Sequence, residues 1–272
     1  MSFFRNALLY PFDKCAAKPW AQPWAERLHA LALRAMNCGG GAHLSESGER
    51  WVMRRLAQRI PTQQPVVLFD VGANRGDFSL ALLDAFGRHS AVELYAFEPS
   101  AVLQPALNAA LGTHADRAKI ITLGISDGAG SQPLFRPSNP NGSGCQSLYQ
   151  RRLEHFGETM RPGETVALET LDRFCERERI DRIDFLKLDI EGHELAALRG
   201  ASSLLRAGKI DWIQFEFGGC NIDSRTYFQD FFYMLRERYD LYRIIREGLY
   251  PIKSYRERHE IFLTTNFLAM RR

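Results

Sequence analysis

Cysteine is scarce and scattered in this sequence of 272 residues. The five cysteines are Cys15, Cys38, Cys145, Cys175 and Cys220, and no two of them form a CxxC pair. Zinc sites and thioredoxin-type redox sites need such closely spaced pairs, so the sequence supports neither. An odd, dispersed set in a chain of this length predicts free thiols in a reducing compartment.

Long apolar runs are also missing. No segment approaches the ~18 consecutive apolar residues that cross a bilayer. At the N-terminus, Arg5, Asn6 and Asp13 interrupt the apolar stretch that a signal peptide would need. We therefore predict a cytoplasmic protein without a transmembrane segment.

Charge of one sign does not dominate. The 35 Lys and Arg residues against 32 Asp and Glu residues give a formal net charge of +3, and they are spread along the chain. Nucleic-acid-binding proteins concentrate basic residues in a patch or stripe, so we expect no nucleic-acid partner. The expected partner is instead a small-molecule or glycan substrate, and the sequence gives no oligomeric state.

Two parts of the chain differ in pattern. Residues 1–64 contain two helix-like segments, AERLHALALRAM and ERWVMRRLAQRI, separated by a break with three consecutive glycines. We expect this part to be a helical N-terminal extension packed on the main domain. From residue 65 to 272, short β-branched runs alternate with helical stretches, which is typical of βαβ units and a parallel sheet covered by helices on both faces.

The C-terminal part and an insertion depart from this alternation. The runs LYRIIREGLYPIK and EIFLTTNFLAM predict an antiparallel hairpin at one sheet edge. Residues 126–170 are rich in Gly, Pro, Ser and Asn and interrupt the βα rhythm. We expect short strands near QPLFR and TVALE in this insertion, with a mobile loop at SNPNGSGCQS between them.

A turn with two glycines follows the first predicted strand, in FDVGANRGD. Gly72 and Gly76 can adopt positive φ and let a ligand approach the backbone, with Ala73 and Asn74 between them. The helix that follows presents unpaired N–H groups to an anionic group. A dinucleotide fingerprint reads GxGxxG, whereas this turn reads GxxxG, so a dinucleotide fits poorly.

Polar residues also end the next two predicted strands. Glu98, at the end of the second strand, is placed to accept hydrogen bonds from both ribose hydroxyls of a nucleoside. Ser126 and Asp127, after the third strand, are placed near an adenine. Together with the turn, these residues predict an S-adenosylmethionine site.

The segments DVGANRGDFS, FEPS, GISDGAG, ETLDRF, FLKLDIEGHE and TNFLA resemble the FkbM-type methyltransferases over about residues 65–270. The resemblance implies a class I methyltransferase fold, Rossmann-like and α/β, with a seven-stranded, mostly parallel sheet. It implies S-adenosylmethionine as the donor and usually O-methylation of a hydroxyl. It assigns Asp70, Gly72, Asn74 and Gly76 to the methionine end of the donor, Glu98 to the ribose and Asp127 to the adenine.

A second polar group is predicted from strand geometry. Lys187 and Asp189 occupy alternate positions of one strand, and Gln214 and Glu216 do the same on the next. Neighbouring parallel strands end at the same edge of a sheet, so these groups should cluster there. His193 follows at the start of the next helix.

These residues are the catalytic candidates, because a hydroxyl becomes a good nucleophile only when a base takes its proton. We expect Asp189 or His193 to be the base, Glu216 to orient it, and Lys187 to keep buried carboxylates ionised. A Mg²⁺ ion held by Asp189 and a nearby oxygen ligand could do the same, and the sequence does not choose between these mechanisms.

The sequence thus predicts an S-adenosylmethionine-dependent O-methyltransferase acting on a hydroxyl of a sugar or glycan. The alternatives are an O-methyltransferase of a polyketide or other secondary metabolite, and a methyltransferase-fold binding module that does not catalyse.

Overall fold

The computed structural model describes residues 16–41, 44–139 and 146–272. Its strands are β1 (Val66–Val71), β2 (Val92–Phe97), β3 (Ala118–Ile121), β4 (Gly124–Ile125), β5 (Gly130–Pro137), β6 (Met160–Glu169), β7 (Ile183–Leu188), β8 (Ile210–Phe217), β9 (Tyr239–Ile245), β10 (Gly248–Pro251) and β11 (Thr265–Arg271). Its α-helices are α2 (Gln22–Ala35), α3 (Glu49–Arg59), α4 (Asp77–Ala85), α5 (Gln104–Leu111), α6 (Leu171–Glu178), α7 (Glu194–Arg199), α8 (Ser202–Ala207), α9 (Cys220–Ser224) and α10 (Phe228–Leu235). Its short 3₁₀ helices are η1 (Pro19–Ala21), η2 (Gly112–His114), η3 (Glu154–Phe156) and η4 (Glu257–His259).

The central sheet has two covered faces. Successive side chains of a strand point to opposite faces, so Leu68 and Phe69 of β1, both fully buried, belong to different cores. Leu68 packs in the core under α3, α4 and α5, and Phe69 packs in the core under α6, α7, α8 and α10. Burial on both faces explains why the strands are almost continuously apolar in sequence.

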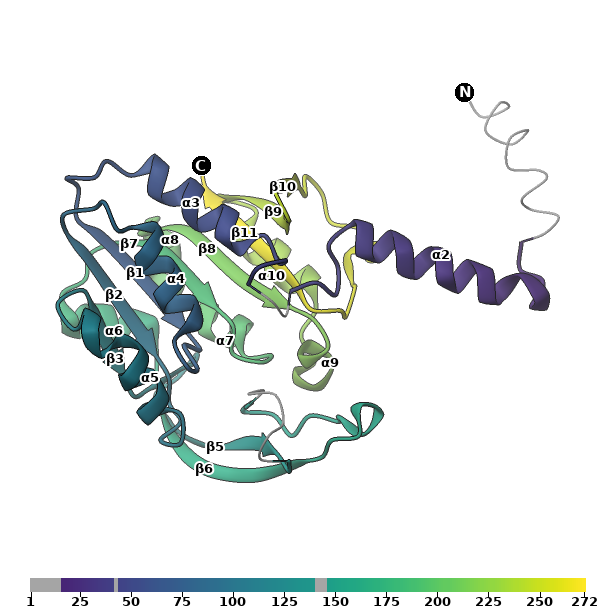
Figure 1. Ribbon diagram of the computed structural model, residues 1–272, viewed down its shortest axis with the longest axis horizontal. Helices are drawn as coiled ribbons and strands as arrows, with labels where there is room; N and C mark the ends of the chain where they lie inside the picture. The colour runs from purple at the N-terminus through teal and green to yellow at the C-terminus, as the bar shows by residue number, and fades with distance from the viewer. Residues whose placement is uncertain (1–15, 42–43, 140–145) are drawn as a thin grey trace.

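The sheet has eight strands in the order β10-β9-β11-β8-β7-β1-β2-β3 (Figure 1). Strands β3, β2, β1, β7 and β8 are parallel neighbours, and β11 runs antiparallel to both β8 and β9. This arrangement confirms the predicted Rossmann-like α/β fold with a mostly parallel sheet.

The C-terminal strands differ in detail from the prediction. The run LYRIIREGLYPIK forms a hairpin by itself, β9 and β10, because a turn at Arg246 and Glu247 separates its two halves. The last run forms β11, which lies inside the sheet between β8 and β9 and not at its edge. The sheet therefore has one strand more than the seven expected.

The insertion forms a second, three-stranded sheet together with β4, the strand just before it, in the order β4-β6-β5. Strands β5 and β6 confirm the predicted strands near QPLFR and TVALE. They extend together as an arm below the carboxyl ends of the central strands (Figure 1). The middle of the predicted loop, residues 140–145, lies outside the described residues.

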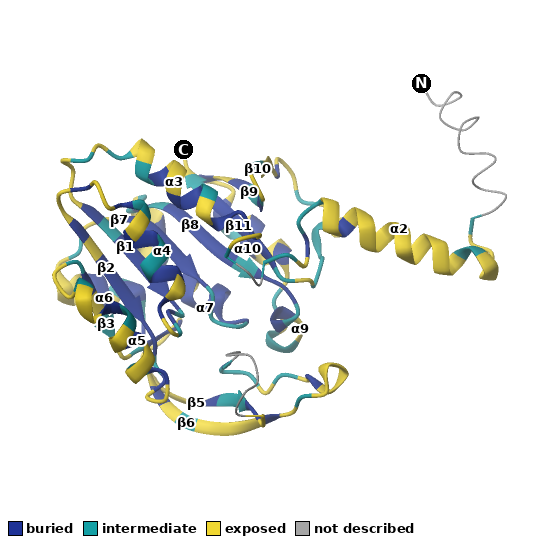
Figure 2. Cartoon of the chain, in the orientation of Figure 1, coloured by how far each residue is buried: buried dark blue, intermediate teal, exposed yellow. Residues whose placement is uncertain are grey.

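The two helices before β1 behave differently. Helix α3 buries Val52, Met53 and Leu56 against the main sheet. Helix α2 projects away from the domain and is exposed along its length, with Leu33 as its buried residue (Figures 1 and 2). The prediction that the extension packs on the main domain is therefore wrong for α2, because its large apolar residues other than Leu33 are exposed.

Within the described residues, no helix is long and apolar enough to cross a membrane. The described cysteines, Cys38, Cys175 and Cys220, are buried and form no disulfide with one another. Cys15 and Cys145 lie outside the described residues.

Candidate active site

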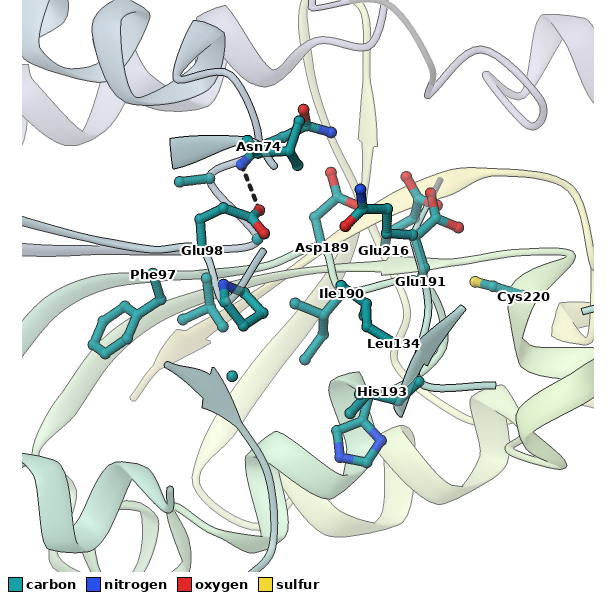
Figure 3. A pocket seen from close by; sticks show the side chains of 18 of the residues that line it. Asn74, Phe97, Glu98, Leu134, Asp189, Ile190, Glu191, His193, Glu216 and Cys220 are labelled. Carbon is teal, nitrogen blue, oxygen red and sulfur yellow. Dashed lines mark hydrogen bonds between the residues drawn. The ribbon is translucent and has the colours of Figure 1, made fainter. Parts of the chain in front are cut away.

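A cavity of about 1060 Å³ opens at the carboxyl ends of β1, β2, β7 and β8. This is the edge of an open α/β sheet at which ligands bind. Segments from the N-terminal extension and from the β5–β6 arm complete its wall. Figure 3 shows Glu98 beside Asn74 on one side and the carboxylates of Asp189, Glu191 and Glu216 together on the other.

The turn after β1 lies against the loop after β7. Gly72 has φ +89°, and a Cβ atom there would lie 1.9 Å from the carbonyl oxygen of Asp189. The amides of Gly72 and Ala73 both donate to the carbonyl of Phe97, at 3.0 and 2.9 Å. Gly72, Ala73 and Asn74 line the cavity, so the turn forms part of its wall.

Gly76 lies where α4 begins beside α5. It has φ +93° at the N-cap of α4, and a Cβ atom would lie 3.1 Å from Ala110 and Leu107 of α5. Its missing side chain therefore allows α4 to start close to α5. Gly76 does not contribute to the cavity wall in the described part of the chain.

Glu98 faces the cavity from the end of β2. Its carboxylate accepts hydrogen bonds from the backbone N–H of Asn74 at 3.0 Å and of Ser100 at 2.9 Å (Figure 3). Burial raises the pKa of Glu98, and these two amides oppose the rise. The carboxylate is thus fixed in place against the Gly72–Asn74 turn, with its charge stabilised by backbone dipoles.

Asp70 lies beneath the cavity and not in its wall. Its side chain is fully buried, accepts a hydrogen bond from Ser79 at 2.6 Å, and lies 3.5 Å from the ammonium of Lys187. In the described structure it does not line the cavity. Asp70 therefore links helix α4 to strand β7, behind the residues that line the cavity.

Ser126 and Asp127 follow β4. Ser126 is buried, and its hydroxyl lies 2.9 Å from Nε2 of His193. Asp127 is exposed, 3.2 Å from the Ser126 hydroxyl. In the described structure neither lines the cavity, which is bounded here by Leu123, Gly124 and Ile125.

His193 lies at the N-cap of α7, with both ring nitrogens hydrogen-bonded. The Tyr149 hydroxyl is 2.9 Å from Nδ1, and Ser126 is at Nε2. Burial lowers the pKa of His193, and the charge of Asp127 opposes this. The ring lies apart from the carboxylate group (Figure 3), so His193 joins the end of β4 to α7.

Lys187 stands at the centre of the acidic residues. Its ammonium lies 3.2 Å from Asp189 and 3.5 Å from Asp70, and 4.4 Å from the centre of the Phe78 ring. Burial alone would lower the pKa of Lys187, but Asp189, Asp70 and Glu49 raise it. Lys187 is therefore a fixed positive charge. Its ion-pair partner Asp189 has 34% of its side chain exposed and lines the cavity.

Glu216 stands beside Asp189 on the neighbouring strand. Lys187 pairs with Gln214 across β7 and β8, so the positions that follow are also adjacent. Burial raises the pKa of Glu216, and the charges of Asp189, Glu191 and Glu194 raise it further. Glu216 is thus biased toward its protonated form next to Asp189. The predicted cluster of Lys187, Asp189, Gln214 and Glu216 is present.

The sequence reading missed Glu49, the first residue of α3. Its two carboxylate oxygens accept hydrogen bonds from Gln214 at 2.6 Å and Ser47 at 2.7 Å. Burial raises the pKa of Glu49, and the charge of Lys187 opposes the rise. Glu49 lines the cavity, so the N-terminal extension contributes to the site. Glu49 follows no predicted strand, and an acidic residue at a helix start is ordinary, so the strand-end pattern did not single it out.

It also missed a set of contacts between the arm and the loop after β7. The Ser147 hydroxyl donates to the carbonyl of Glu191 at 2.8 Å, Tyr149 contacts His193, and Arg151 forms an ion pair with Glu191. The start of this described segment, residues 146–151, therefore binds the turn that follows Asp189. These contacts join residues 40 or more positions apart, and no sequence pattern predicts such a pairing.

No group of three or more His, Cys, Asp or Glu side chains is arranged to hold a metal ion among the residues that the structure describes. Beside Asp189, where the predicted Mg²⁺ would lie, the structure has the ammonium of Lys187. The Mg²⁺ alternative therefore has no support from the donor set.

Comparison with known proteins gives a family match. The sequence model of the Methyltransferase FkbM domain matches residues 70–242, which run from the end of β1 through most of β9. The matched range contains the Gly72–Asn74 turn, Glu98, Lys187, Asp189 and Glu216.

Two curated proteins are similar over 49% of the chain. The AMB antimetabolite synthetase AmbE of Pseudomonas aeruginosa is 29% identical, and the chain covers 8% of it. The methyltransferase sdnD of Sordaria araneosa is 31% identical, and the chain covers 59% of it.

Among solved structures, an FkbM methyltransferase of Methylobacillus flagellatus has 16% identity and a TM-score of 0.46, with 78% of this chain and 44% of that chain covered. An O-methyltransferase of Bacillus cereus in complex with SAH has 14% identity and a TM-score of 0.47, with 97% and 96% covered.

Proposed function

Because the chain belongs to the family of methyltransferases with an FkbM domain, it is an S-adenosylmethionine-dependent methyltransferase, and we propose that it methylates a hydroxyl of a sugar or glycan. The observation that carries the proposal is the polar group at one end of the cavity: Asp189 open to the cavity, Lys187 behind it and Glu216 beside it. The cavity then has two ends, one for the cofactor and one for the acceptor.

The cofactor end is the Gly72–Asn74 turn with Glu98. Bound there, S-adenosylmethionine supplies a methyl group on a sulfonium, which transfers in line to a nucleophile. The Glu98 carboxylate is the group for the ribose hydroxyls, because the amides of Asn74 and Ser100 hold it in one position. Gly72, Ala73 and Asn74, which line the cavity, lie beside the methionine portion.

The acceptor end is formed by Asp189, Glu216 and Glu49. Asp189 is the base: its carboxylate reaches the cavity, whereas the two ring nitrogens of His193 are already bonded to Ser126 and Tyr149. Asp189 takes the hydroxyl proton as the oxygen forms its bond to the methyl carbon. Glu216, biased toward the protonated form, donates a hydrogen bond that orients the acceptor.

The chemistry of the wall supports a hydroxyl-rich acceptor. Carboxylates and polar groups from separate segments face the cavity here: Glu49, Asp189, Glu191, Glu216, Arg151 and Thr264. Such groups hydrogen-bond to several hydroxyls at once, and they are costly to bury against an apolar ligand. A sugar satisfies them better than a hydrocarbon skeleton does.

A secondary-metabolite acceptor is the second candidate, favoured by the arm. Leu134, Leu148, Leu153 and Phe156 bring apolar surface to the cavity. One curated relative is an antimetabolite synthetase. An aglycone with a single hydroxyl would use this surface more than the acidic end.

Methyl transfer from labelled S-adenosylmethionine to a panel of sugars, glycans, polyketides and lipid alcohols tests the choice. We expect labelled sugars or glycans, and no labelled product with Asp189→Asn. Turnover of only polyketides or lipid alcohols would contradict the sugar proposal. Cofactor binding without transfer to any acceptor would favour the non-catalytic binding module.

A further inference from the structure

Helix α2 carries an apolar stripe that nothing in the described structure covers. Trp24, Leu28 and Leu31 are 63%, 64% and 63% exposed, and Trp20, one turn before, is 65% exposed. At 3.6 residues per turn, Trp24, Leu28 and Leu31 lie within an arc of about 60°. Scattered exposed apolar residues are ordinary, but a row of large ones along one helix face marks an interaction surface.

The stripe faces away from the domain. Leu33, the buried residue of α2, lies on the opposite side of the helix from Trp24, Leu28 and Leu31. The helix projects from the domain and is exposed over most of its length, with Leu33 buried near its C-terminal end (Figure 2). Among residues 16–41, 44–139 and 146–272, the stripe is therefore open to a partner and belongs to no core.

The charges around the stripe have one sign. Arg27 and Arg34 border it on one side, and Lys18 precedes the helix. The guanidinium of Arg27 lies 5.0 Å from the centre of the Trp24 ring, so positive charge and aromatic surface are adjacent. Glu26, the acidic residue of the helix, lies on the side of Leu33, away from the stripe.

From this geometry we infer that α2 docks the enzyme on an anionic lipid surface. A helix with Trp and Leu on one face, basic residues beside them and little overall hydrophobicity lies in the membrane interface plane. Tryptophan prefers the headgroup level, and Arg and Lys are attracted to anionic lipid. The inference does not depend on which acceptor the enzyme methylates.

A second copy of the chain fits the stripe less well. If two α2 helices paired antiparallel about a two-fold axis, the bordering Arg27 and Arg34 of each copy would lie on the same side and face each other. Like charges at such a helix border oppose pairing. An anionic surface instead pairs with every charge beside the stripe.

The test is flotation of the full-length protein with vesicles of phosphatidylcholine alone and of phosphatidylcholine mixed with phosphatidylglycerol. We expect binding to the mixed vesicles that weakens at high salt. Leu28→Gln with Leu31→Gln, and separately Arg27→Glu with Arg34→Glu, should each reduce binding by about tenfold or more.

A matched control is Val102→Gln with Tyr250→Gln, which removes apolar side chains that are 60% and 56% exposed elsewhere on the molecule. It should bind vesicles as the wild type does. All variants should keep their affinity for S-adenosylhomocysteine, because α2 does not contribute to the described cavity wall.

Three results would overturn the inference: wild-type protein that does not float with mixed vesicles, binding that survives the Leu28 and Leu31 substitutions, or a dimer in sedimentation velocity that those substitutions dissociate without vesicle binding. The last result would assign the stripe to a second copy of the chain.

Discussion

The two ends of the cavity are built in different ways. The cofactor end comes from one short turn, Gly72–Asn74, and the adjacent strand end at Glu98, whose carboxylate is held by the amides of Asn74 and Ser100. The acceptor end is assembled from side chains of segments far apart in the chain; the hydrogen bond between Glu49 and Gln214 alone spans 165 positions. A site built from two neighbouring segments depends on few positions, whereas a site assembled from distant side chains can change its substrate when any one of them changes.

Asp189→Asn should give the largest difference between the two ends, because it should lower kcat and leave cofactor binding nearly unchanged. Removing the base should lower kcat by about 10²–10⁴-fold, because the acceptor hydroxyl keeps its proton. The dissociation constant of S-adenosylhomocysteine should change by less than about threefold. Steady-state kinetics and calorimetry on the same preparation measure both.

Asp84→Asn, an exposed aspartate on α4, is the matched control and should leave both values unchanged. An Asp189→Asn enzyme with nearly normal kcat would show that another group takes the proton.

Gly72→Ala should destabilise the fold where the cofactor turn contacts the β7 loop, which joins the two ends. The new Cβ atom would lie 1.9 Å from the Asp189 carbonyl oxygen, in a residue with φ +89°. We expect a loss of more than about 3 kcal/mol in the free energy of unfolding, or about 6–12 °C in Tm by calorimetry. Gly112→Ala is the control, because nothing lies within 4 Å of its Cβ position. Equal Tm values for the two variants would mean that the turn can shift away from the β7 loop.

Glu49→Gln should affect the acceptor end alone. Both Glu49 oxygens accept hydrogen bonds, from Ser47 and Gln214, and an amide can accept only one of them. We expect kcat to fall by about tenfold, while the affinity for S-adenosylhomocysteine stays the same. Glu46→Gln, an exposed residue paired with Arg246, is the control. If Glu49→Gln instead changed the affinity for S-adenosylhomocysteine and left kcat unchanged, Glu49 would belong to the cofactor end, which would contradict the assignment.

A further expected effect is a pH dependence of stability due to Glu194. Its carboxylate accepts hydrogen bonds from the amides of Ile190 and Gly192, and burial raises its pKa from 4.5 to about 8. Between these values the folded state binds the proton and the unfolded state does not. The free energy of unfolding should therefore fall as pH rises through this window, by at most about 1.4 kcal/mol per pH unit.

Glu194→Gln should flatten this slope in urea titrations between these pH values, because the amide imitates the protonated acid. Glu237→Gln, at an exposed position, should leave the slope as it is. An unchanged slope in Glu194→Gln would assign the pH dependence to other buried acids.

The features that could be predicted from the sequence are those that depend on local pattern alone. Alternating apolar runs gave the parallel strands, and polar residues at strand ends gave Glu98, Lys187, Asp189 and Glu216, since parallel strands end at one edge. Glu49, Tyr149 and Arg151 could not be found this way, because their partners are set by tertiary packing between distant segments.

The position of α2 was missed for a related reason. An amphipathic pattern shows that a helix has an apolar face, but it does not say whether that face packs on the same chain. Strand β11 was misplaced at the edge for the same reason: its alternation does not specify its neighbours, β8 and β9.

The central claim, a cofactor end that works independently of the acceptor end, is tested most directly by calorimetric titration with S-adenosylhomocysteine. The wild type, Glu98→Ala and Asp189→Asn should be titrated side by side. We predict binding by the wild type and Asp189→Asn with similar affinity, and a loss of about 30-fold or more in Glu98→Ala. Equal binding by all three proteins, or none by the wild type, would contradict the account.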